Sequence, residues 1–156
     1  MSVFIRIVLC GVLCFSLMGG GSYAASVDFK GTTIDGKEFV FSEYLAGKKG
    51  AVVVFFTTWC HFCQKEITGV IKKQHLFEEN NLGLVLINEG ESKEKVTTYL
   101  SGRNFHFPVV LDTTSRIGRE AGIKGVPSFF YFDRKGEVLK FSFSLHPKFL
   151  ELYNSK

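Results

Sequence analysis

The run AVVVFFT, residues 51–57, constrains the fold of this chain more than any other stretch. It is continuously apolar and rich in β-branched and aromatic side chains, which is typical of a strand buried on both faces of a covered sheet. A second run of this kind, LGLVLIN, occupies residues 82–88. Between the two runs, apolar residues recur at near-helical spacing over about 61–80, so we expect a helix there.

The rest of the chain alternates between strand and helix patterns. The dipeptide Asp35-Gly36 lies between two short β-type runs and predicts a hairpin. Further strands are expected at 106–112 and on either side of a turn at 133–136, and further helices at 91–102, 114–123 and 146–156, the last with Pro147 in its first turn. This order predicts an α/β fold, a single domain with a mixed central sheet and helices on both faces.

The first 24 residues carry the pattern of a secretory signal peptide. Arg6 precedes a short apolar run at residues 7–18, and the small residues Ser22 and Ala24 fit a cleavage site before Ala25. The run is short for a membrane span, which needs about 20 residues. We therefore expect a signal peptide at 1–24 and an exported, for example periplasmic, domain at 25–156, with an uncleaved membrane anchor as the alternative.

The charge of the chain is mildly basic and spread along its length. The formal net charge is +4, and the basic residues form only short clusters such as Lys48-Lys49 and Lys72-Lys73. No basic stripe of the kind that binds nucleic acid is present in the sequence, so we expect no nucleic-acid partner.

Cys60 and Cys63 are the two cysteines that remain beyond the predicted signal, because Cys10 and Cys14 lie within it. A zinc site needs four ligands, and the four histidines show no suitable spacing, so we expect no metal. A structural disulfide that closes so small a loop would stabilise the fold only weakly. A redox couple is the interpretation that the pattern favours.

The position of the pair explains this preference. Cys60 is expected near the start of a helix, where unpaired amides and the helix dipole stabilise a thiolate and favour nucleophilic attack. Cys63 lies one turn further on the same face and could resolve a mixed disulfide. His61 could add positive charge, or could be an exposed spacer. Trp59 could cover the thiols, although packing at the strand end is the more ordinary role. Glu66, one more turn along, could exchange a proton with the pair, or could be solvated.

Four segments resemble the thioredoxin superfamily, and more closely its exported thiol–disulfide oxidoreductases of the TlpA/ResA type: TWCHFCQKE, INEGESKEKVTTYL, FPVVLD and GVPSFFYFDRKGEV. The resemblance implies a thioredoxin-like fold and thiol–disulfide exchange. It implies that Pro127 is a cis-proline facing the cysteines and that Val126 offers backbone hydrogen bonds to a substrate. It also favours a functional role for Glu66.

The resemblance further implies the partners of such an enzyme. These are protein thiol or disulfide substrates, apocytochrome c among them, and a membrane-bound thiol electron donor. No dissociable cofactor is implied beyond the Cys60–Cys63 disulfide. The implied activity is that of a disulfide reductase; a disulfide oxidant or isomerase, or a non-catalytic binding module on the same scaffold, are the alternatives.

The chain departs in two places near the motif from the families that it resembles. The dipeptide between the cysteines is His61-Phe62, without the proline that is usual there, and this dipeptide tunes the reduction potential. Cytoplasmic thioredoxins carry a buried acid on the preceding strand where this chain has Val54. That difference leaves Glu66 as the only carboxylate that we expect near the pair.

Overall fold

The computed structural model describes residues 28–154, so the predicted signal peptide at 1–24 and its cleavage site lie outside the described residues. Seven strands form one sheet: β1 (Lys30–Thr33), β2 (Glu38–Val40), β3 (Gly50–Phe56), β4 (Leu82–Glu89), β5 (Val109–Asp112), β6 (Ser128–Asp133) and β7 (Val138–Ser142). Their order in the sheet is β2-β1-β5-β4-β3-β6-β7. Strand β4 runs parallel to β3 and β5, and the remaining pairs are antiparallel, so the predicted mixed sheet is confirmed.

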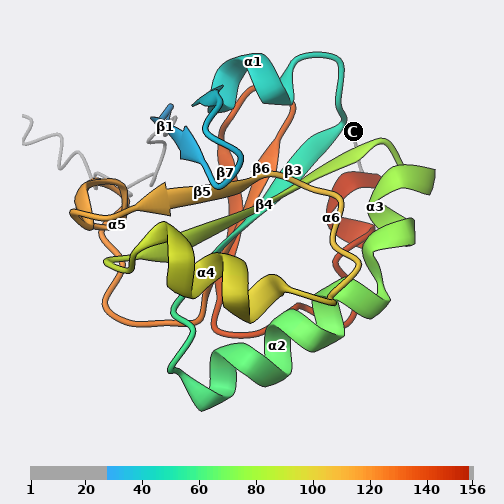
Figure 1. The fold of residues 1–156 in the computed structure, drawn as a ribbon. Helices are drawn as coiled ribbons and strands as arrows, with labels where there is room; N and C mark the ends of the chain where they lie inside the picture. Colours follow the sequence, from blue (N-terminus) through green and yellow to red (C-terminus); the bar gives the residue numbers. More distant parts are fainter. Residues whose placement is uncertain (1–27, 155–156) are drawn as a thin grey trace, which may run out of the picture.

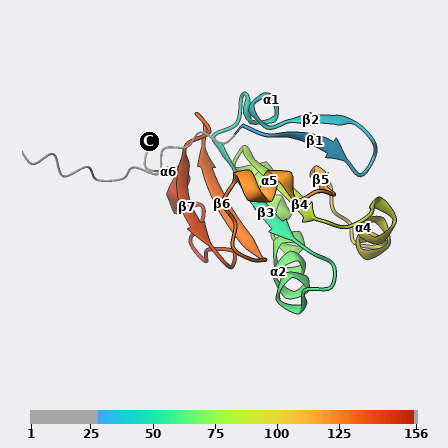
Figure 2. The ribbon, with the colours of Figure 1, turned by 90° about the vertical axis from the view of Figure 1, so that its left-hand side faces the viewer.

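Helices cover both faces of the sheet, as predicted (Figures 1 and 2). They are α1 (Phe41–Leu45), α2 (His61–Lys72), α3 (Gln74–Glu79), α4 (Lys93–Leu100), α5 (Arg116–Glu120) and α6 (Glu151–Asn154). Val54 and Phe56 of β3 pack with residues of α2, α3 and α4, whereas Val53 and Phe55 pack with residues of α1 and α5. The two-residue period of a strand therefore divides the apolar core into two layers. No helix within residues 28–154 combines the length and apolar character that crossing a bilayer requires.

Strand β3 is the centre of the fold. All seven of its residues are buried, because β4 and β6 flank it on both edges and helices lie on both faces. Its parallel register with β4 pairs Phe56 with Asn88. The carboxyl ends of the two strands consequently lie side by side, and the segments that follow them meet at one edge of the sheet.

Two local predictions are wrong, and one short helix was not predicted. The expected single helix over 61–80 is divided at Lys73, whose amide bonds to the Val70 carbonyl three residues back and ends α2. The expected C-terminal helix begins only at Glu151, because the segment that contains Pro147 forms turns with bonds such as Phe149 N to His146 O. Helix α1 was not predicted; its short sequence, FSEYL, carries too few residues for a periodic pattern.

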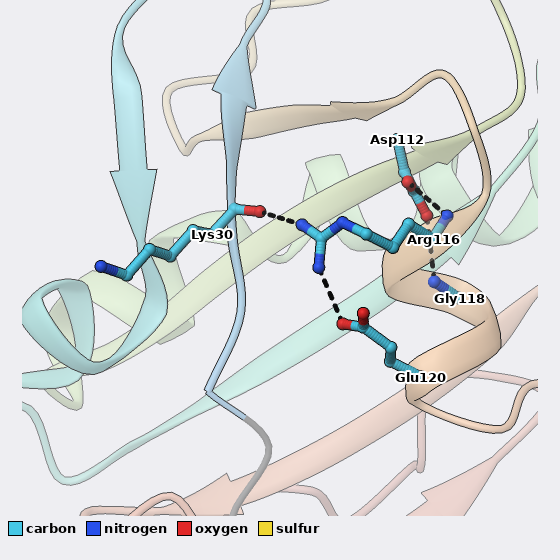
Figure 3. Close-up of polar contacts among 5 residues, drawn as sticks. All are labelled: Lys30, Asp112, Arg116, Gly118 and Glu120. Carbon is cyan, nitrogen blue, oxygen red and sulfur yellow. Dashed lines mark hydrogen bonds and ion pairs between the residues drawn. The ribbon is translucent and has the colours of Figure 1, made fainter.

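Helix α5 is anchored to the sheet by two side chains (Figure 3). Asp112, the last residue of β5, accepts hydrogen bonds from the backbone amides of Arg116 (2.8 Å) and Gly118 (3.0 Å). The Arg116 guanidinium donates to the Lys30 carbonyl of β1 and to the Glu120 carboxylate, both at 2.8 Å. The two bonds to Asp112 satisfy amides of the first turn of α5 that have no partner within the helix, and the Arg116 side chain ties α5 to β1.

Candidate functional site

Cys60 is the N-cap residue of α2. Its Sγ accepts a hydrogen bond of 3.3 Å from the backbone amide of Cys63, and its thiol faces the Val126 carbonyl oxygen at 3.6 Å. Both cysteines are free thiols; Cys60 retains 9% of its surface and Cys63 none. The cysteine that keeps some exposed surface is therefore the one at the positive end of the helix, where negative charge is stabilised.

Cys63 is held as a thiol. Burial raises its pKa to about 12, helped by its hydrogen bond with Cys60, whereas a hydrogen bond with the Thr57 backbone acts in the opposite direction. A thiol with so high a pKa attacks poorly in bulk water, but it can act on a disulfide formed beside it once its proton is removed. The geometry thus separates an accessible thiol from a buried one.

The peptide bond between Val126 and Pro127 is cis, as the resemblance implied. It lies directly before β6, which pairs with β3, so the bond is brought next to the end of the strand that precedes the cysteines. The Val126 carbonyl faces Cys60 Sγ from across the site. The structure therefore brings Val126 and Pro127 together with the cysteine pair, 66 residues away in sequence.

Aromatic side chains surround the pair on the outside. Trp59 and Phe62 are each 73% exposed, so the more ordinary interpretation of Trp59, packing at the strand end, is wrong. His61 is also exposed, with its ring 6.4 Å from that of Phe62 in an edge-on arrangement. The two exposed aromatic side chains flank Cys60 along the chain and leave apolar surface beside the motif.

Glu66 lies on α2 beyond the cysteines and is partly buried. Its carboxylate accepts a hydrogen bond of 3.0 Å from the backbone amide of Leu145, in the segment after β7. Among the described residues, no hydrogen bond joins Glu66 to either cysteine. The partial burial that the sequence suggested is present, but the contact that the structure shows is with the chain after β7.

A second carboxylate lies next to the motif, so the prediction that Glu66 would be the only one is wrong. Glu91 follows β4 and is 7% exposed. It accepts hydrogen bonds of 2.7 Å from both the amide and the hydroxyl of Thr58, two residues before Cys60. The sequence did carry a signal for it, because the segments after two adjacent parallel strands meet at one edge of the sheet.

Tyr99 of α4 is another neighbour that the sequence did not indicate. Its hydroxyl is buried and has no hydrogen-bond partner among the described residues, and its ring lies 5.9 Å from that of Phe56. Burial raises its pKa; the nearby Arg103 lowers it, and the two cysteines raise it further. A hollow of about 530 Å³ opens beside it, lined by Thr58, Trp59, Glu91, Glu94, Lys95, Thr98 and Tyr99. The segment just before Cys60, Thr58 and Trp59, thus borders this hollow.

No three His, Cys, Asp or Glu side chains within residues 28–154 gather as a metal site requires. The reactive groups that the site does bring together are two thiols, a helix N-terminus and a backbone carbonyl beside a cis-proline. One thiol can attack a disulfide, and the other lies close enough to displace the product from it. The arrangement can therefore perform thiol–disulfide exchange.

Comparisons with known proteins agree with this chemistry. A model of the AhpC/TSA family matches residues 24–141. The thiol-disulfide oxidoreductase ResA of Bacillus subtilis is 32% identical over 106 residues, which cover 68% of this chain and 58% of that protein. ResA of Bacillus thuringiensis subsp. konkukian is 25% identical over 148 residues, which cover 88% of this chain and 83% of that protein. The chain thus spans less than two thirds of the Bacillus subtilis relative.

Solved structures show the same architecture. A thiol:disulfide interchange protein of the thioredoxin family from Chlorobium tepidum TLS is 32% identical, with a TM-score of 0.64, over 78% of this chain and 84% of that one. A DsbE-type protein from Chlorobium tepidum reaches a TM-score of 0.72 at 22% identity, over 83% and 92%. The predicted thioredoxin-like fold is confirmed.

Proposed function

Since this chain belongs to the AhpC/TSA family, we propose that it is an exported thiol–disulfide oxidoreductase that reduces disulfides in other proteins. The observation that carries the proposal is Cys60, which caps the N-terminus of α2 and faces the Val126 carbonyl at a cis-proline, with the fully buried Cys63 one turn further on. Relatives and structural neighbours named for thiol–disulfide exchange support the same reaction.

The reaction begins with the Cys60 thiolate, which attacks one sulfur of a client disulfide. A mixed disulfide forms between Cys60 and the client, and the second client sulfur leaves as a thiolate that takes up a proton. Cys63 then loses its proton and attacks the Cys60 sulfur, which releases the reduced client. Two electrons pass to the client, and the enzyme is left with a Cys60–Cys63 disulfide.

The direction of the reaction is inferred from the resemblance of the motif segments to exported thiol–disulfide oxidoreductases of the TlpA/ResA type, which commonly act as disulfide reductases. Burial raises the pKa of Cys63 to about 12, so Cys60 is the cysteine whose thiolate sets the potential of the pair. We propose that apocytochrome c is among its clients and that a membrane-bound thiol protein returns it to the dithiol.

Export is proposed from the N-terminal sequence. The basic residue, apolar run and small residues of positions 1–24 fit a secretory signal. In an oxidising compartment a dithiol reductant needs a dedicated electron source, which is why a membrane donor belongs to the proposal. Whether residues 1–24 are removed or anchor the domain is tested by the mass of the protein recovered from the membrane and soluble fractions.

The reduction potential of the Cys60–Cys63 couple tests the direction. The protein is equilibrated with glutathione or dithiothreitol buffers, and the oxidised fraction is measured by alkylation and mass spectrometry. A value near that of thioredoxin, about −270 mV, supports the reductase; a value of about −120 to −180 mV indicates an oxidant or isomerase. A Cys60→Ser protein that keeps full biological activity would indicate a binding module instead.

A further inference from the structure

Glu91 is a buried carboxylate at the edge of the sheet where the cysteine motif begins. Its Oε2 accepts hydrogen bonds from the Thr58 amide (2.7 Å) and from Asn88 Nδ2 (2.8 Å), and its Oε1 accepts one from the Thr58 hydroxyl (2.7 Å). Three donors on two oxygens are needed because a buried carboxylate without partners is strongly unfavourable. Both oxygens of the Glu91 carboxylate therefore have hydrogen-bond donors within the protein.

Thr58 is held at every one of its polar atoms. Glu91 accepts hydrogen bonds from the amide and the hydroxyl of Thr58. The side chain of Gln64, on α2, donates to the Thr58 carbonyl at 2.9 Å. Asn88 also donates to the Phe56 carbonyl at 3.5 Å, so the end of β3 is tied to the same group. The turn between β3 and α2 is thus fixed from β4 and from α2 together.

The chain on both sides of Thr58 positions the two sulfurs. The backbone of Thr57 forms the hydrogen bond that lowers the pKa of Cys63 against the effect of burial. Two residues after Thr58, Cys60 places its sulfur between the Cys63 amide and the Val126 carbonyl. A displacement of Thr58 would consequently shift both thiols relative to their partners.

We propose that Glu91 is a positioning residue of the redox pair, and that it sets the reactivity of Cys60 by holding Thr58 in place. The inference rests on the proposed exchange reaction, but not on its direction. Glu91 acts through geometry, because its two hydrogen-bonded oxygens fix the turn. Burial opposes the ionised form, whereas Asn88, Thr58 and the charge of Lys95 favour it, and the net effect lowers the pKa of Glu91.

Two substitutions at Glu91 separate geometry from charge. In Glu91→Gln, the amide oxygen can occupy the Oε2 position and accept from Thr58 and Asn88, while the NH₂ group donates to the Thr58 hydroxyl. This variant loses the charge and keeps the contacts. Glu91→Ala loses both. Thr58→Val removes one donated hydrogen bond and leaves the carboxylate in place, so it tests the same contact from the other side.

Two measurements compare the variants. The rate at which the reduced proteins react with a small aromatic disulfide, 5,5′-dithiobis(2-nitrobenzoic acid), reports the attack by Cys60 across a pH series. Equilibration with glutathione gives the reduction potential of the Cys60–Cys63 couple. We expect Glu91→Ala to slow the attack on the order of tenfold or more, because small misplacements of reacting groups are costly. The glutathione equilibrium should shift in the same variant; a tenfold shift corresponds to about 30 mV. Glu91→Gln should remain within about threefold of the wild type in the rate of attack and in the glutathione equilibrium, because its contacts hold Thr58 in the same place.

The controls decide between the outcomes. Glu79→Ala, at an exposed carboxylate on α3, should match the wild type. The positioning role is overturned if a folded Glu91→Ala protein keeps the wild-type rate of Cys60 attack and the wild-type glutathione equilibrium. It is also overturned if Glu91→Gln is as impaired in these two measurements as Glu91→Ala. If Glu91→Ala does not fold, the Thr58→Val protein decides, and wild-type values of the rate and the equilibrium in that variant overturn the positioning role. A wild type without measurable exchange contradicts the proposed function itself, which these variants do not address.

Discussion

The backbone amide of Cys63 lies 3.3 Å from Cys60 Sγ, so one cysteine of the motif caps the helix that carries the other. This single contact couples the two thiols within one helical turn. It gives Cys60 a hydrogen-bond donor that stabilises negative charge on sulfur, and it places the Cys63 side chain on the inner, fully buried face of α2. The two cysteines therefore have different chemistry although they share one motif.

Alkylation of the reduced protein should reveal this difference. At mildly acidic pH, iodoacetamide should modify Cys60 first, because Cys63 has no exposed surface and a pKa of about 12. Peptide mass spectrometry after brief treatment measures the two sites separately. Cys63→Ser should accumulate the mixed disulfide with a client and Cys60→Ser should form none. Preferential labelling of Cys63 would contradict the assigned roles.

Glu66 can be tested for proton exchange apart from its structural contact. Glu66→Gln can still accept the Leu145 amide but cannot carry a proton, so we expect a changed pH dependence of Cys63 attack and an unchanged fold. Glu66→Ala should also lose about 1 kcal/mol of stability with that hydrogen bond. Stopped-flow rates over a pH series provide the measurement. A Gln variant with the wild-type pH profile would leave Glu66 with a structural role only.

The exposed aromatic residues beside Cys60 should act on clients and not on the fold. Trp59→Ala should change the free energy of unfolding by less than about 0.5 kcal/mol, because the side chain is 73% exposed. It should raise the KM for a disulfide-containing polypeptide, since apolar contact area is lost. Reduction of glutathione disulfide, which is too small to cover Trp59, serves as the control. An equal loss with both substrates would argue against client binding by Trp59.

Glu89 should make stability depend on pH near neutrality. Burial raises its pKa to about 7; Ser115 opposes this, and the neighbouring Asp112 adds to it. A carboxyl whose folded pKa is raised stabilises the protein below its unfolded pKa of about 4.3, and this stability is lost as the pH rises through about 7. Glu89→Gln should therefore gain about 1 kcal/mol relative to the wild type across this range, allowing for solvent screening of a half-exposed group.

Urea unfolding of the wild type and Glu89→Gln at a series of pH values measures this difference. Glu79→Gln, at an exposed carboxylate of α3, is the matched control and should show no such gain. A stability difference between the Glu89 variant and the wild type that stays constant from acid to alkaline pH would show that Glu89 titrates at its ordinary value.

The anchoring of α5 should depend on Asp112 much more than on the surface ion pair beside it (Figure 3). Asp112→Ala leaves the amides of Arg116 and Gly118 without their acceptor, and we expect a loss of about 2 kcal/mol. Glu120→Ala removes only an exposed partner of Arg116 and should cost less than about 0.5 kcal/mol. Denaturant unfolding compares the two, and equal effects would contradict the assignment.

The strands, their order of appearance and the redox pair could be predicted because they depend on local sequence. An uninterrupted apolar run specifies a strand covered on both faces, and the spacing of Cys60 and Cys63 places both on one turn of the following helix. Short elements lacked this information. Helix α1 and the division between α2 and α3 each depend on too few residues for a periodic pattern to specify them.

The surroundings of the pair were decided by tertiary structure. Glu91 reaches Thr58 only because β4 pairs in parallel with β3. The strand–helix–strand order favours this pairing, but the register that places Glu91 beside Thr58 is set by tertiary packing. Likewise, Glu66 bonds to Leu145 across 79 residues, and the exposure of Trp59 depends on what packs against it. Periodicity and capping act within a few residues, whereas hydrogen-bond partners and burial are set by segments far apart in the chain. The sequence by itself thus determined the reacting thiols, and only the fold determined what holds them.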